Sequence, residues 1–173
     1  MSLAFPIERP LTRAIGSSVR WDGRRLWTPA ALFAGGQQGV WYEPKPEYLY
    51  QDAAGTVPVT VDGDPVGLML DVSGNGNHAT QSTSAARPIH SSSAPLQVYD
   101  NVDDAMNVTL PAITAATVAI ATPTGADIQY PVDLSSGSYT ITGSHSGIII
   151  REGELTAAEQ QQVTGYLNAQ AGV

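Results

Sequence analysis

The stretch from residue 67 to residue 81 reads GLMLDVSGNGNHATQ. An apolar run leads into the segment SGNG at 73–76, and glycine and asparagine adopt the positive φ angles of tight turns more readily than other residues. A second short segment, 77–81, then follows the turn. Two extended segments joined in this way are typical of a β-hairpin. We therefore predict a strand over 66–71, a turn, and a returning strand over 77–81.

Further short β segments follow this hairpin at intervals of roughly 8 to 12 residues. Alternating apolar positions mark them, as at Met106, Val108 and Leu110. Only 14 % of the residues are charged, whereas Gly and Pro number 17 and 12, a composition that favours strands and turns over a helical bundle. The predicted strands are 96–99, 105–110, 117–122, 128–134, 138–142 and 147–151. The predicted fold class is mainly β, an antiparallel β-sandwich.

One α-helix is predicted at the end of the chain, over 156–170. Thr156 and Glu159 have the spacing of a capping box, in which each side chain binds the other residue's backbone amide. Gly172 stands where a helix commonly ends. The intervening apolar residues recur with the i, i+3, i+4 spacing of one helix face; they are Val163, Tyr166 and Leu167.

The predicted domain spans 28–173 and begins with an irregular lead-in over 28–65. Gly and Pro punctuate this lead-in, so turns and short extended pieces are expected. A short helix is predicted over 29–33, because Thr28 can cap it and Pro29 suits the first helical position.

An extended, basic arm over 1–27 precedes this domain. It holds five arginines and two acidic residues, a net charge of +3, whereas the rest of the chain holds three basic and fourteen acidic residues, a net charge of −11. Its apolar residues follow neither helical nor strand spacing, so the arm alone is expected to lack regular structure. Large aromatic residues in such a segment commonly become buried against some other surface, and a neighbouring subunit is the preferred interpretation here. The residues predicted to anchor the arm are Arg9, Arg13, Arg20, Trp21, Arg24, Arg25 and Trp27.

Three stretches resemble bacteriophage structural proteins that carry concanavalin/laminin-G-like jelly-roll domains. They are residues 67–81, the segment LFAGGQQGVWYEP at 32–44, and the closing segment 148–172. The resemblance implies a jelly-roll sandwich within a virion. The segment between residues 101–105 and the final helix is shorter here than in the lectin-like members, so we expect a reduced jelly roll.

Oxygen-bearing side chains raise the question of a calcium site. Asp71, Asn75 and Asn77 offer hard oxygen ligands within the hairpin, and Asp103 and Asp104 add two carboxylates. Their spacing does not match a twelve-residue EF-hand loop, and tight turns use the same residue types for their backbone geometry. The turn interpretation is therefore favoured, and no metal or cofactor is predicted.

No catalytic set is predicted either. The chain has no cysteine, which excludes disulfides and thiol catalysis. His78, His90 and His145 stand singly, and GSHSG at 143–147 lacks the G-x-S-x-G spacing of a hydrolase nucleophile. A glycine-rich turn between strands is the preferred interpretation of that segment.

These observations lead to the expectation of a non-enzymatic structural subunit of a tailed bacteriophage virion. It is expected to be present in several copies, as a homo-oligomer or multi-copy assembly, to be assembled in the bacterial host cytoplasm, and to dock on other virion proteins through its arm. Capsid decoration, head fibre, collar and tail positions all fit. Nucleic acid is disfavoured as a partner because the acidic body would repel it. No apolar run reaches the roughly 18 residues of a membrane helix, and no signal peptide is predicted.

The alternative is a carbohydrate-binding, lectin-like module that recognises the host surface. Sugar sites commonly combine an aromatic surface with a few amide and carboxylate groups. Before the last helix, the tyrosines expected to supply such a surface are Tyr99, Tyr130 and Tyr139.

Overall fold

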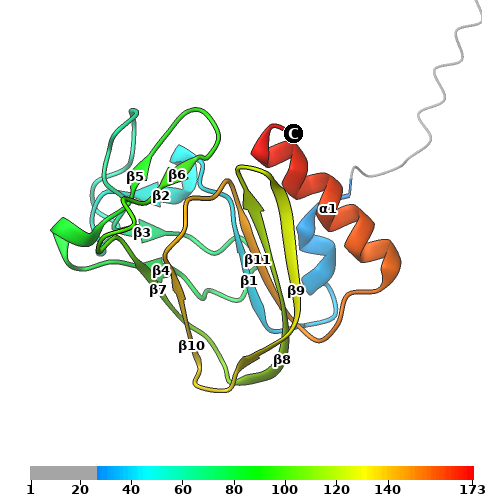
Figure 1. Ribbon diagram of the computed structural model, residues 1–173. Coiled ribbons are helices and arrows are strands. Elements are labelled where there is room, and N and C mark those ends of the chain that lie inside the picture. Colours follow the sequence, from blue (N-terminus) through cyan, green and yellow to red (C-terminus); the bar gives the residue numbers. More distant parts are fainter. Residues whose placement is uncertain (1–26) are drawn as a thin grey trace, which may run out of the picture.

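Two antiparallel sheets pack face to face in the computed structural model, which describes residues 27–173 (Figure 1). The first sheet has the strand order β1 (Gly39–Tyr42), β11 (Ile148–Glu152), β8 (Ile113–Thr122), β9 (Gly125–Leu134). The second has the order β10 (Ser138–Ile141), β7 (Met106–Thr109), β4 (Ala79–Thr80), β3 (Leu68–Met69), β2 (Leu49–Tyr50). A small third sheet pairs β5 (Ile89–His90) with β6 (Gln97–Val98). The predicted mainly β, antiparallel fold class is confirmed.

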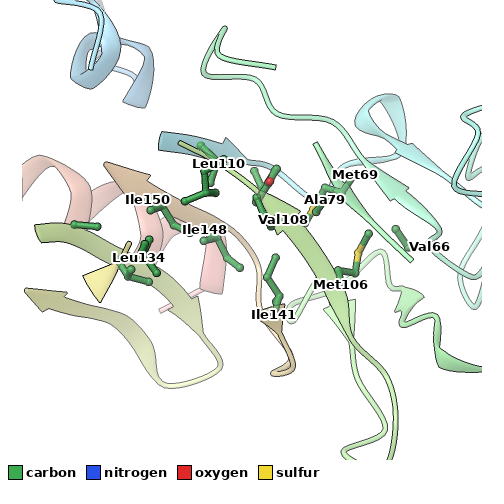
Figure 2. Packing of buried hydrophobic residues seen from close by; sticks show 14 of the residues in the cluster. Val66, Met69, Ala79, Met106, Val108, Leu110, Leu134, Ile141, Ile148 and Ile150 are labelled. Carbon is green, nitrogen blue, oxygen red and sulfur yellow. The ribbon is translucent and has the colours of Figure 1, made fainter. Parts of the chain in front are cut away.

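The main hydrophobic core fills the space between the first and second sheets. Alternate residues of each strand point inward, because successive side chains of a strand lie on opposite faces. Figure 2 shows Ile148 and Ile150 of the first sheet on one side of this core, and Met69, Met106 and Val108 of the second sheet on the other. Burying each such side chain contributes about 1.5–3 kcal/mol, so this core holds the two sheets together.

A second core lies on the outer face of the first sheet, under the helix α1 (Ala157–Ala171) and the short 3₁₀ helix η1 (Pro29–Phe33). Ala119 and Ile149 point into it from the sheet, and Val163 and Leu167 meet them from α1. The first sheet is therefore covered on both faces, as Figure 1 shows for α1. This explains why β8 and β11 read as nearly continuous apolar runs rather than as alternating ones.

The predicted hairpin is confirmed, although its strands are shorter than expected. β3 pairs with β4 through Leu68 opposite Thr80 and Met69 opposite Ala79. Beyond this pairing the Asp71 backbone amide donates to His78 Nδ1, at 3.0 Å. Side chains thus take over hydrogen bonds that a longer strand pair would make between backbones.

The lead-in is more ordered than the sequence indicated, because it contributes β1 to the first sheet and β2 to the second. The 3₁₀ helices η2 (Pro46–Tyr48) and η3 (Ser84–Ala86), like β5, were also not predicted. Gly39 lets β1 approach β11 closely: its φ is +142°, and a Cβ there would lie 1.9 Å from the Ile150 carbonyl oxygen. Only glycine fits that position.

Both predicted helices are confirmed. Pro29 stands at the start of η1, and Thr156 and Glu159 form the predicted capping box at the start of α1. Gly172 ends α1 in the left-handed conformation, with a φ of 78°.

Among the described residues, no helix is both long and apolar enough to cross a bilayer. The predicted arm lies outside the described residues except for Trp27.

Candidate functional site

The Asp71 carboxylate organises the turn between β3 and β4. Its Oδ1 accepts hydrogen bonds from the backbone amides of Trp41, at 3.0 Å, and Ser73, at 2.9 Å. Its Oδ2 accepts from the Ser73 hydroxyl, at 2.8 Å, and from the Asn77 amide, at 3.0 Å. Since Trp41 belongs to β1, this one buried carboxylate ties the hairpin turn to the edge of the first sheet.

The asparagines of the turn serve the same purpose. The side-chain amides of Asn75 and Asn77 both donate to the Gly39 carbonyl, at 3.1 and 3.0 Å, and Asn75 also donates to Gln37. The Tyr42 hydroxyl donates to the Asn77 carbonyl. These bonds support the turn interpretation, because the amide groups face backbone oxygens and hold the lead-in against the hairpin.

Asp103 and Asp104 lie elsewhere, in an acidic loop together with Asp100. One carboxylate oxygen from each of the three lies within 4.8 Å of the others. Asp100 Oδ1 accepts from the backbone amides of residues 102–104, and Asp104 Oδ2 accepts from the Asp100 amide, at 2.9 Å. Burial, and then the charges of Asp100 and Asp103, raise the pKa of Asp104. The oxygen-bearing side chains considered as possible calcium ligands thus lie in two separate places.

Two hollows that share Thr142 form what we call the inter-sheet groove. One, of about 360 Å³, is lined by residues 101–105 and Thr142. The other, of about 260 Å³, lies between β10 and the facing ends of β8 and β11. Its lining includes Ile120, Thr122, Tyr139, Thr142, Ser144 and Ile148. The groove therefore joins the acidic loop to the space between the two sheets.

A further acidic residue lies beside this groove. Asp127 of β9 stands opposite Ile120 of β8, and paired residues of neighbouring strands share one face of a sheet. Partial burial raises the pKa of Tyr139, and the nearby charge of Asp127 raises it further. The Gln129 side-chain amide donates to Asp127 Oδ2 at 2.9 Å, which places an amide and a carboxylate together.

Three polar side chains lie in the interior near the groove. Tyr99 is 2 % exposed, and Gln97 and His145 are fully buried. The Tyr99 hydroxyl, Gln97 Oε1 and both ring nitrogens of His145 have no protein hydrogen-bond partner. The Tyr99 and His145 rings lie 5.9 Å apart. Burial raises the pKa of Tyr99, and the charge of Asp104 raises it further.

The serines of the segment 143–147 bind the backbone on either side of β6. The Ser144 hydroxyl oxygen accepts from the Tyr99 amide at 3.0 Å, and that of Ser146 accepts from the Leu96 amide at 3.3 Å. Neither serine is hydrogen-bonded to the His145 ring. The arrangement supports the turn interpretation of this segment.

The arm leaves the described domain at an aromatic cluster, which we call the arm-exit cluster. The ring of Tyr166, on α1, packs edge-on against Trp27 at 6.2 Å and against Trp41 at 6.1 Å. The Tyr166 hydroxyl donates to Glu43, whose other oxygen is 3.1 Å from Lys45 Nζ. Trp27 was predicted as an arm anchor, and here it contacts the second core of its own chain. The other predicted anchors lie outside the described residues.

The three tyrosines expected to supply a sugar-binding surface differ in their exposure. Tyr99 is buried and cannot offer a ring face to a ligand, which corrects its role in the alternative function. Tyr139 lines the groove, whereas Tyr130 is exposed and is not part of its lining. Asp100 and Asp127 were not predicted as site residues. Of these two residues, only Asp100 could have been recognised from the sequence, because it stands three residues before Asp103 and four before Asp104.

No family model, curated protein or solved structure matches this chain.

Proposed function

We propose that this protein is a non-enzymatic structural subunit of a tailed bacteriophage virion, docked to its neighbours through residues 1–26. The observation that carries the proposal is the arm-exit cluster. Trp27 packs against Tyr166 and the second core, so the basic arm begins at a defined point on the β-sandwich. Such an arrangement suits a projecting module that is tethered by a terminal segment.

The three stretches that resemble phage proteins support the proposal by their placement. Residues 32–44 contribute β1, which pairs with β11 from the closing stretch. The turn of residues 67–81 is bonded to the backbone of β1 through Asp71, and α1 covers the same sheet. The three stretches therefore form one continuous unit, and Trp27 rests on it.

The charge distribution indicates how the arm would be used. A segment of net charge +3 attached to a body of net charge −11 is attracted to acidic protein surfaces, and charge complementarity of this kind speeds and orients association. Aromatic residues such as Trp21 would then supply the buried contact area.

Deletion of residues 1–26 tests the proposal, with Trp27 retained because it packs on the body. We expect the truncated chain to fold normally and to be at least tenfold depleted from particles assembled in infected bacteria, as measured by quantitative mass spectrometry of purified particles. Circular dichroism controls for folding. Particles that contain the truncated chain at the normal copy number would refute the proposal.

A glycan-binding module is the second candidate, and the groove supplies the observation in its favour. Tyr139 lies there beside the Asp127 carboxylate and the Gln129 amide, which is the combination that sugar sites commonly use. If this candidate is correct, Tyr139→Ala weakens binding on a glycan array about tenfold or more, while Tyr130→Ala leaves it unchanged. An array without any bound glycan, or equal effects of the two variants, would eliminate it.

A further inference from the structure

The inter-sheet groove carries negative charge that no described basic side chain balances. Within residues 27–173 the ion pairs are Lys45 with Glu43 and Arg151 with Glu159. The remaining basic residue of the body, Arg87, donates to the carbonyls of residues 51, 81 and 82. None of these three cations forms an ion pair with Asp103, Asp104 or Asp127, so the acids of the groove have no basic partner among the described residues.

We infer that this groove receives the arginine-bearing arm of a second copy of this chain. The inference rests on the proposed function and names the partner surface of the arm. The occupant is residues 1–26 of a neighbouring copy, and the receiving residues are Asp103 and Asp104 at one end, Thr142 in the middle, and Tyr139 with Asp127 at the other.

The chemistry of the two surfaces is complementary. Arginine binds carboxylates through paired N–H donors, and its planar guanidinium also stacks on aromatic rings, which Tyr139 offers in the groove. A cation also relieves the mutual repulsion of Asp100, Asp103 and Asp104. A neutral sugar satisfies the hydrogen bonds but leaves that repulsion in place.

The arm is long enough to reach another molecule. At roughly 3.3 Å per residue, 26 extended residues span up to about 86 Å. Trp27 packs on the helix side of the first sheet, whereas the groove opens on the side that faces the second sheet. An arm that enters the groove of its own copy must pass around an edge of the sheet. An arm that enters the next copy links the subunits into a chain.

Sedimentation velocity on the purified full chain tests the inference. We expect concentration-dependent self-association at 50 mM salt that disappears at 1 M salt, where screening shortens the range of charge interactions to about 3 Å. The double variant D103N/D104N is expected to weaken self-association about tenfold. Thr142→Lys, which places a positive charge in the middle of the groove, is expected to weaken it to a similar extent. The variant E47Q/E154Q removes the same charge from two exposed residues outside the groove, and it should behave as the wild type.

The outcomes separate this inference from the proposed function. A full chain that stays monomeric at every concentration overturns the inference, whether the arm then occupies its own groove or another protein. Self-association that is lost on deletion of residues 1–26 but unchanged in D103N/D104N and Thr142→Lys overturns it as well. So does Tyr139-dependent glycan binding by a chain that does not self-associate. If the deletion variant is excluded from particles while D103N/D104N enters them normally, the proposed function stands and only this inference fails.

Discussion

Replacing Asp71 by alanine is expected to lower the free energy of unfolding by about 3–5 kcal/mol. The carboxylate accepts four hydrogen bonds, three of them from the backbone amides of Trp41, Ser73 and Asn77. Each buried donor left without a partner costs about 1–3 kcal/mol. Urea unfolding followed by tryptophan fluorescence measures the loss, because Trp41 sits directly on the affected strand.

Asp133→Ala is the matched control for this experiment. Asp133 is exposed and accepts a hydrogen bond from the Ser135 amide within a surface turn. Its replacement should cost less than about 1 kcal/mol. A loss below about 1 kcal/mol in Asp71→Ala would show that the turn does not hold β1 against the hairpin.

His145 is expected to make the protein sensitive to mild acid. Its imidazole is fully buried, and burial lowers its pKa to about 3, from an ordinary value near 6.5. Between pH 3 and pH 6.5 the imidazole is protonated in the unfolded chain but stays neutral in the folded chain. The neutral, buried imidazole therefore costs no stability above pH 6.5. As the pH decreases from 6.5 toward 3, the free energy of unfolding falls by up to about 1.4 kcal/mol per pH unit. From pH 6.5 to 4.5 the expected loss is about 2–3 kcal/mol.

Comparison with His145→Leu isolates this effect. Leucine is apolar and close in size, and the imidazole it replaces has no protein hydrogen bond to lose. The variant should show a much flatter stability curve between pH 6.5 and 4.5, a range that lies above the ordinary pKa values of aspartate and glutamate. Denaturant titrations at several pH values measure both curves. Identical pH dependence in the two proteins would show that His145 is not held neutral in the fold.

The fold was predictable where local chemistry decides the structure. The glycine and asparagine residues of the turn after Met69 predicted the hairpin, and the spacing of Thr156 and Glu159 predicted the start of the helix. β1 was missed because it is short and lies among turn residues, and because its partner Ile149 comes from the far end of the chain. The contact of Glu43 with Tyr166 spans 123 residues and has no local signal.

The candidate site was harder to predict, because it depends on register between strands. Asp127 lies at the groove only through its pairing with Ile120, and the Tyr99 backbone amide is bound by Ser144, 45 residues further along the chain. Trp27 precedes Pro29 in a segment without periodicity, so it read as part of the arm, yet it packs on Tyr166.

Disulfide trapping between two populations of the chain tests whether the arm of one copy occupies the groove of another, since the sequence has no cysteine of its own. One population carries Thr142→Cys in the groove, and the other carries a single cysteine at position 9, 13, 20 or 24. We expect at least one arm position to give a mixed disulfide dimer with Thr142→Cys at low salt but not at 1 M salt. The control Glu47→Cys, used in place of Thr142→Cys, should give none. Equal trapping at positions 142 and 47, or none at position 142 from any arm position, would contradict it.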